Sequence, residues 1–300
     1  MTKPVSEIIQ LKDGTDMVVH VWKPTTSTTE QSIKGIVIIY HGFLAHGLYP
    51  TVRYAAELLS RTNQYIVLAP NQRGHGTKPA GLQHYLPSRE IVLEDSTTVV
   101  QYAQNKFPQC SKIFLMGSSM GGTIALNVAQ KLRKDTTLLK DGFAICGVVL
   151  LAPMLQLSVG GPARTLLWML SFIVPTWEII PSSSTNSEKQ YRDPMKRAEC
   201  DNASIQSSSK IRIASASTCV ELASTIQEEF HDITTPYLLL VADEDCVVDN
   251  QGDFNLFDQS ISNTDKTMKR YPALHGLLCE PSPLVDTIER DILEWISARS

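Results

Sequence analysis

The sequence has 300 residues, of which 43% are hydrophobic and 19% are charged, and its formal net charge is -4 at pH 7. This balance is that of a globular chain, and it excludes disorder as the main state, which requires low hydrophobicity together with high net charge. The weakly acidic charge provides no basic surface for nucleic acid. We therefore expect a folded chain with no nucleic-acid partner.

The most apolar stretch of the sequence is LLWMLSFIV at residues 166–174. The uncharged stretch between Arg164 and Glu178 is shorter than the roughly 20 apolar residues that a membrane-spanning helix needs. The first residues also lack the apolar core of a secretory signal peptide. We expect a cytoplasmic protein whose contact with a membrane, if it makes one, is peripheral.

Along the chain, short apolar runs alternate with longer helical patterns, which is typical of a mostly parallel sheet covered by helices on both faces. Residues 17–24 alternate between apolar and polar and predict an antiparallel edge strand. The later runs predict strands buried on both sides, at 35–40, 65–70, 112–117, 147–153 and 236–242. Helical patterns lie between them, at about 50–61, 89–105, 119–133, 252–261 and 284–298.

Residues 153–227 interrupt this alternation, because no obvious sheet strand occurs among them. A long disordered loop is the alternative to a folded insertion, but it would expose the apolar stretch at 166–174. We therefore predict a helical lid inserted into the core. The chain then divides into a first part of the core at 1–152, the lid at 153–227 and a second part of the core at 228–300.

The sequence GSSMG at residues 117–121 has the pattern GxSxG and lies between an apolar strand and the helical run TIALNVAQKLRK. In this context the pattern is typical of a nucleophile elbow, a tight turn that holds a serine on strained backbone above the sheet. Ser119 is therefore the expected nucleophile, and Ser118 fills a variable position. The N–H of Met120, at the start of the helix, is an expected oxyanion donor.

A serine nucleophile needs a histidine base and a carboxylate that orients the base, and in this architecture the order along the chain is Ser, acid, His. His231 precedes the strand at 236–242, so it comes before any acid at the end of that strand. His275, in YPALHGLL, is the histidine that remains after that point. We therefore expect His275 to be the base.

The acid is less clear, because VADEDCVVD follows the strand with four carboxylates: Asp243, Glu244, Asp245 and Asp249. Asp249 suits the cap of the helix that begins near residue 252. Asp243 lies nearest to the strand, whereas spacing slightly favours Asp245. The residues alone leave these two open.

A second oxyanion donor is expected in the loop HGFLAHG that follows the strand at 35–40. Gly42 allows the backbone to turn sharply, and the N–H of Phe43 is then the donor. His41 and His46 could resemble metal ligands, but without a third ligand nearby we expect them to shape the loop by hydrogen bonds. We expect Arg73 to brace its own loop, and we expect no metal and no cofactor.

Five segments resemble the monoacylglycerol lipase family of α/β-hydrolase serine esterases, which includes plant-type lysophospholipase and caffeoylshikimate esterase-like members. They are HGFLAHGLYP, NQRGHGTKP, GSSMGG, VADEDCVVDNQG and YPALHGLL. Their order and spacing agree with the family from about residue 15 to the end, and PMLQLS and YRDP in the lid region are also similar. The resemblance implies an α/β-hydrolase fold, with a mostly parallel central sheet, flanking helices and an inserted helical lid.

The family's site residues map onto this chain as nucleophile Ser119, base His275, and oxyanion donors Phe43 and Met120. The family's acid lies seven residues before a glycine that opens the next helix. Because Gly252 occupies that position here, the resemblance places the acid at Asp245.

The chain departs from the family at several positions near the site. The family usually has Gly-Glu where Leu44 and Ala45 stand, and histidine where Ser118 stands. It usually has aspartate in place of Asn71 and serine in place of Thr77. No departure removes a member of the triad, so the changes bear on substrate preference and not on activity.

The expected function is a serine carboxylester hydrolase that cleaves lipophilic esters such as monoacylglycerols through an acyl-enzyme. Lysophospholipids or small phenolic esters are alternative substrates, and a non-catalytic α/β-hydrolase binding protein is the alternative from another class. The apolar residues at 166–174 exceed one helical stripe. Either all of them pack between lid and core, or the surplus lines an acyl tunnel or contacts a membrane surface.

Overall fold

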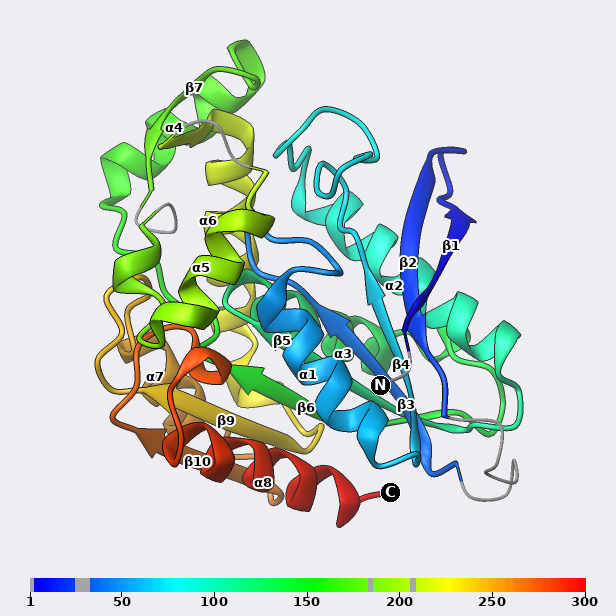
Figure 1. Ribbon diagram of the computed structural model, residues 1–300. Coiled ribbons are helices and arrows are strands. Elements are labelled where there is room, and N and C mark those ends of the chain that lie inside the picture. The colour runs from blue at the N-terminus through cyan, green and yellow to red at the C-terminus, as the bar shows by residue number, and fades with distance from the viewer. Residues whose placement is uncertain (1–2, 25–32, 183–185, 206–208) are drawn as a thin grey trace.

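The computed structural model describes residues 3–24, 33–182, 186–205 and 209–300 (Figure 1). Its main sheet has eight strands in the spatial order β1-β2-β4-β3-β5-β6-β9-β10. Their bounds are β1 (Val5–Gln10), β2 (Asp16–Trp22), β3 (Gly35–Tyr40), β4 (Tyr65–Pro70), β5 (Lys112–Ser118), β6 (Ala144–Leu151), β9 (Tyr237–Ala242) and β10 (Lys266–Tyr271). The pairs β1–β2 and β2–β4 are antiparallel, and the other neighbours are parallel. The predicted mostly parallel sheet is confirmed.

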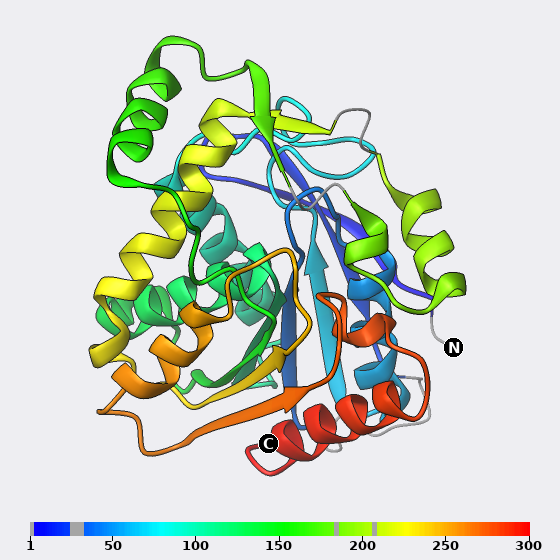
Figure 2. The same ribbon diagram turned by 90° about the vertical axis from the view of Figure 1, so that its left-hand side faces the viewer.

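Helices cover both faces of the sheet, as Figures 1 and 2 show. The helices are α1 (Pro50–Arg61), α2 (Arg89–Lys106), α3 (Met120–Lys134), α4 (Gly161–Ile173), α5 (Pro194–Ala203), α6 (Ile213–Glu228), α7 (Gln251–Gln259) and α8 (Leu284–Ser297). Apolar side chains of α1 and α8 pack on one face, and those of α2, α3, α6 and α7 pack on the other. The fold is that of an α/β-hydrolase.

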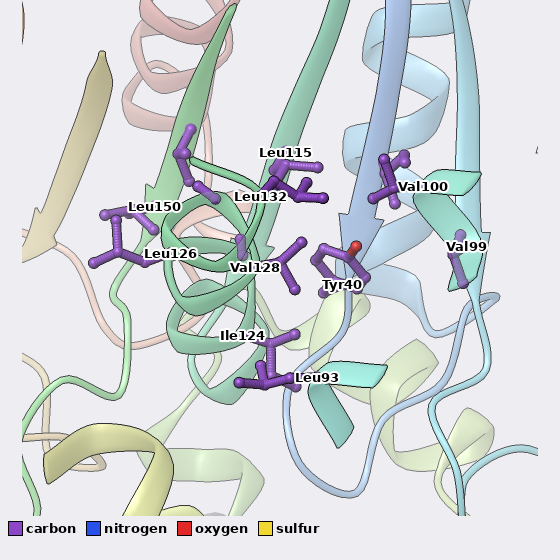
Figure 3. Close-up of a cluster of buried hydrophobic side chains, with 14 of the residues drawn as sticks. Tyr40, Leu93, Val99, Val100, Leu115, Ile124, Leu126, Val128, Leu132 and Leu150 are labelled. Carbon is purple, nitrogen blue, oxygen red and sulfur yellow. The ribbon is translucent and has the colours of Figure 1, made fainter. Parts of the chain in front are cut away.

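The largest apolar cluster lies between the sheet and the pair α2 and α3 (Figure 3). Apolar residues recur every four positions along α3, at Ile124, Val128 and Leu132, and all three are buried. Full burial of each such side chain stabilises the fold by about 1.5–3 kcal/mol. Since α3 begins directly after β5, this packing fixes the turn between the two elements.

Two edge strands were not predicted from the sequence. Residues 17–24 were expected to form an antiparallel edge strand. The antiparallel strand is confirmed as β2, but β1 pairs outside it, so the edge position is wrong. The pattern of β1 is weak because Val5 and Ile8 face solvent, at 56% and 69% exposure. The opposite edge strand, β10, has the mostly polar sequence KTMKRY. An edge strand is covered on fewer sides, so neither one shows a continuous apolar run.

The segment between β6 and β9 contributes no strand to the main sheet among its described residues. It contains α4, β7 (Glu178–Pro181), α5, β8 (Lys210–Arg212) and α6, and β7 pairs with β8 in a small sheet that the sequence did not predict. Part of the predicted lid, at 183–185 and 206–208, lies outside the described residues. The boundaries at 152 and 227 stay a prediction. No helix of the described chain combines the length and the apolarity of a membrane span.

Candidate active site

The backbone turns sharply at Ser119, between β5 and α3. Its φ is 55° and its ψ is -124°, a conformation that costs a non-glycine residue about 1–3 kcal/mol and persists only where packing imposes it. A Cβ on Gly121 would lie 2.0 Å from the carbonyl oxygen of Tyr40, and a Cβ on Gly117 would lie 2.2 Å from the Gly121 backbone. The two glycines therefore let helix and strand approach closely, and the strained turn expected from GxSxG is present.

The strand register brings the loops after β3 and β5 to the same edge of the sheet, because Tyr40 pairs with Gly117. A Cβ on Gly42 would lie 3.4 Å from the Cβ of Ser119. The N–H groups of Phe43 and Met120 have no hydrogen-bond acceptor among the described residues. The second of these lies at the N-terminus of α3, where the helix dipole favours negative charge. The geometry leaves two donors beside Ser119.

His275 and Asp245 form a buried pair. The Nδ1 of His275 lies 2.6 Å from Oδ2 of Asp245, and the two side chains are 6% and 0% exposed. The other carboxylate oxygen, Oδ1, accepts the N–H groups of Val247 and Val248 at 2.7 and 3.1 Å. The carboxylate is thus held on both oxygens and fixes the imidazole with its proton on Nδ1.

The neighbouring acids have other partners. Asp243 accepts from Nε of Arg270 at 2.8 Å. Asp249 accepts from the N–H of Gln251, the first residue of α7, at 3.0 Å, but the N-cap residue of that helix is Asn250, so the prediction that Asp249 is the cap is wrong. Of the two acids that the residues left open, the structure brings Asp245 to the histidine and turns Asp243 away from it.

Ser119 and His275 lie on the wall of one cavity of about 70 Å³. Among the described residues no hydrogen bond joins their side chains, and such contacts often tighten only when substrate binds. Much of the remaining wall is polar: Thr51, Ser118, Ser187, Gln190, Asp201 and Ser204. The cavity can therefore hold a polar group next to the candidate nucleophile and base.

The loop histidines make hydrogen bonds within the protein. Nε2 of His41 accepts the N–H of Gln72 at 2.9 Å, so its Nδ1 carries the proton and donates to the Gly42 oxygen at 2.7 Å. Burial holds the pKa of His41 well below its usual value. Nε2 of His46 lies 3.3 Å from the carbonyl oxygen of Ala203, which ties the loop to α5. In the described part of the chain no group of side chains is arranged to hold a metal ion.

Two further loop residues brace the site. Arg73 donates to both oxygens of Asp95 at 2.7 and 3.0 Å and pairs with Asp13 at 2.9 Å, as expected for a bracing role. Asn71, which replaces the usual aspartate of the family, accepts the N–H of Gly47 through its amide oxygen at 2.8 Å. An amide oxygen can make the contact of a carboxylate here, so this departure preserves the loop.

Sequence reasoning missed a charged network beside the candidate base. Arg192, in the segment before α5, pairs with Oε2 of Glu280 at 2.8 Å and with Glu244 at 3.0 Å. Oε1 of the fully buried Glu280 accepts the N–H of Leu274 at 2.7 Å. The network links the loops that carry His275 and Asp245. The YRDP sequence at 191–194 was the available signal, but nothing in it identified the two partners of Arg192.

These features define the class of protein as a serine hydrolase of the α/β-hydrolase fold. They are an elbow serine, a histidine on the same cavity that is paired with a buried aspartate, and two unpaired N–H donors.

Comparison with known proteins agrees with this class. Residues 31–282 match the family described as serine aminopeptidase, S33. Rat monoglyceride lipase is 24% identical over 295 residues, which cover 96% of this chain and 88% of the rat protein. The thermostable monoacylglycerol lipase of Bacillus sp. (strain H-257) is 27% identical over 235 residues, or 78% of this chain and 79% of that protein.

Among solved structures, a soluble variant of monoglyceride lipase from Saccharomyces cerevisiae, in complex with a substrate analogue, has a TM-score of 0.82 at 19% identity. The match covers 100% of this chain and 97% of that one. Paleococcus ferrophilus monoacylglycerol lipase has a TM-score of 0.74 at 23% identity, with 95% and 99% covered. The chain belongs to the S33 family of α/β-hydrolases and, within these, to the monoacylglycerol lipase family; it is an enzyme of the serine ester hydrolase type.

Proposed function

We propose that this enzyme hydrolyses lipophilic carboxylic esters of the monoacylglycerol class to an alcohol and a fatty acid. The observation that carries the proposal is the 2.6 Å contact between Asp245 and His275, because His275 lines the same cavity as the elbow residue Ser119. Similarity to monoglyceride lipases along nearly the whole chain supports the choice of substrate class.

In the proposed mechanism, Oγ of Ser119 attacks the ester carbonyl while Nε2 of His275 takes the hydroxyl proton. Asp245 stabilises the imidazolium through its contact with Nδ1. The N–H groups of Phe43 and Met120 bind the oxyanion, and each such donor typically contributes a factor of about 10²–10³ to kcat. His275 then returns its proton to the leaving alkoxide, and water releases the acyl group by the same steps.

The outer surface of α4 supports a lipophilic substrate. Five large apolar residues of α4 are exposed, at 45% to 74%, and we call them the α4 apolar surface: Leu166, Trp168, Met169, Phe172 and Ile173. The alternative that the whole 166–174 stretch packs between lid and core is therefore wrong. Such exposure marks an interaction site, and we propose that this surface contacts a lipid layer peripherally and passes the acyl chain to the cavity. The cytoplasmic location stays a prediction.

The test is a panel of monoacylglycerols of graded chain length, with lysophospholipids and small phenolic esters as competing substrates. We expect kcat/KM to be highest for a medium- or long-chain monoacylglycerol, with equal amounts of glycerol and fatty acid released. A clear preference for lysophospholipids or phenolic esters would show that the proposed substrate class is wrong, while the proposed mechanism would still hold. No turnover of any ester would favour the non-catalytic alternative.

A further inference from the structure

The loop that carries the proposed donor Phe43 contains a strained residue. The N–H of Ala45 donates to the carbonyl oxygen of Gly42 at 3.2 Å, which closes a turn with Phe43 and Leu44 at its centre. Leu44 has a φ of 67°. This left-handed conformation at the second central position of a turn favours glycine or asparagine, and a leucine adopts it only where its surroundings impose it.

The surroundings of Leu44 come from the segment between β6 and β9. Its side chain is 7% exposed, although the residue lies in a surface loop. It belongs to an apolar group that joins the loop to α4, β7, β8 and α6. We call this group the Leu44 cluster: Phe43, Leu44, Leu167 of α4, Ile180 of β7, Ile211 of β8 and Ala216 of α6. Burial of the leucine in this cluster offsets the unfavourable φ.

The same turn borders the reaction site. Leu44 lines the cavity with Ser119, and Gly42 lies directly against Ser119. The Phe43 ring packs edge-on against His75, with centroids 5.4 Å apart. Because the turn is held by His75 on one side and by the Leu44 cluster on the other, the direction of the Phe43 N–H depends on both contacts.

We propose that Leu44 is a positioning residue. Its packing against the inserted segment directs the Phe43 N–H toward the oxyanion. The inference rests on the proposed function, because it takes Phe43 to be a donor. A glycine at this position would tolerate the same φ without an anchor. With leucine, the turn keeps its conformation only while α4, β7, β8 and α6 pack against the Leu44 side chain. The oxyanion site is therefore complete only when the inserted segment is packed on this loop.

The test compares Leu44→Ala with wild type on a short, water-soluble ester, with kcat expressed per active site titrated by a fluorophosphonate. Alanine has the same unfavourable energy at this φ as leucine, but it lacks the side chain that anchors the turn. We expect kcat to fall about tenfold, part of the loss that follows removal of an oxyanion donor, with KM changed less than twofold. The Ki of a boronic acid that mimics the tetrahedral intermediate should rise by the same factor, and Leu44→Met should restore kcat to within about twofold.

A second arm tests the connection through the cluster. Ile211 lies in β8 and does not line the cavity. We expect Ile211→Ala to lower kcat in the same direction, and the double variant with Leu44→Ala to lose no more than the stronger single variant, because both remove one contact. Leu93→Ala is the matched control: it truncates a buried leucine in α2 and should lower the Tm while kcat per active site stays at the wild-type value.

Leu44→Ala with a lowered Tm but unchanged kcat and Ki would overturn the inference, since Leu44 would then serve packing alone. Additive losses in the double variant would also overturn it. Failure of the proposed function has a different signature: the wild-type protein itself would neither turn over an ester nor react with the fluorophosphonate.

Discussion

Two parts of the inserted segment differ in how they are attached. Residues 187–203, which we call the polar arm, are tied to the loop at 274–280 by hydrogen bonds and ion pairs. The N–H of Gly276 donates to the Gln190 oxygen at 2.8 Å, and Nζ of Lys196 donates to the carbonyl oxygens of Leu278 and Glu280 at 2.9 and 3.2 Å. This arm is part of the frame that holds the candidate base.

Residues 161–181, which we call the apolar arm, are tied to β8 and α6 and, among the described residues, not to the loop at 274–280. No residue of α4 is buried, and Figure 2 shows this helix at the outer end of the molecule. Arg164 donates to Ser224 at 2.6 Å, Arg212 pairs with Glu178 at 2.8 Å, and the Leu44 cluster supplies apolar contact. The difference teaches that two parts of one inserted segment are attached in different ways: the polar arm holds the loop of the candidate base, and we propose that the apolar arm meets the substrate.

The largest expected effect concerns the loops that the polar arm holds. Asp245→Asn should lower kcat by about 10⁴, because the amide stabilises the wrong tautomer of His275. Asp243→Asn is the matched control, and its cost should be far smaller since Asp243 pairs with Arg270. Steady-state kinetics on a short ester measure both, and penalties in the reverse order would assign the acid to Asp243.

The next effect breaks the polar arm itself. Arg192→Ala leaves the buried carboxylate of Glu280 without its cation, and we expect a loss of about 2 kcal/mol in the free energy of unfolding. Turnover of short and long esters should fall by equal factors, because both use the same base. Arg197→Ala, which removes an exposed contact of 4.0 Å with Glu188, is the control and should change little in urea unfolding. A selective loss of long-chain turnover in the Arg192 variant would contradict the division between the arms.

The apolar arm should show the opposite selectivity. Replacing Phe172 and Ile173 by serine should lower turnover of a long-chain monoacylglycerol and binding to liposomes by about tenfold, since two exposed large apolar groups are lost from a lipid contact. Turnover of a short soluble ester and the Tm should stay near wild type. Equal losses of turnover on the short and the long ester would mean that these side chains stabilise the fold and do not contact the lipid substrate.

The smallest effect lies in α7, behind the loop of the candidate acid. Both carboxylate oxygens of Asp253 are buried without a hydrogen-bond partner, and burial followed by the charges of Asp245 and Asp249 raises its pKa well above 3.8. Folding therefore takes up a proton, so this carboxyl destabilises the fold increasingly as pH rises from about 4 toward its raised pKa.

Asp253→Asn should remove this dependence and increase the free energy of unfolding near pH 7 by roughly 1 kcal/mol, while the two proteins converge at acid pH. Urea unfolding at several pH values measures the effect, with the exposed Asp258→Asn as control. A variant that is less stable than wild type at every pH would contradict the raised pKa.

The sequence predicted the parts of the molecule whose local chemistry is sufficient by itself. Continuous apolar runs identified the buried strands, and α1 has the bounds expected of it, since Pro50 marks its start. The elbow at Ser119 could be predicted because a tight strand-to-helix turn demands glycines at fixed spacing. The edge strand β10 and the pairing of β7 with β8 could not, because their patterns are short and partly polar.

The sequence predicted the residues of the candidate site, but not the properties that depend on contacts between distant parts of the chain. The residues alone left Asp243 and Asp245 open, because the choice depends on Arg270, which lies on another strand and draws Asp243 away. The strain at Leu44 was also not predicted. The glycine that the family usually has at this position was a signal for a positive φ, but nothing in the sequence shows the packing that holds a leucine at a φ of 67°. Both properties arise from tertiary packing.

The most direct test is the intact mass of the protein after reaction with a fluorophosphonate probe. We predict that wild type and Ser118→Ala each gain the mass of one probe, because the elbow holds Ser119 beside His275 and leaves Ser118 in a variable position. Ser119→Ala should keep its fold by circular dichroism and gain no mass. Labelling that persists in the Ser119→Ala protein, or a wild-type protein that never reacts, would contradict the assignment of Ser119 as the nucleophile of a serine ester hydrolase.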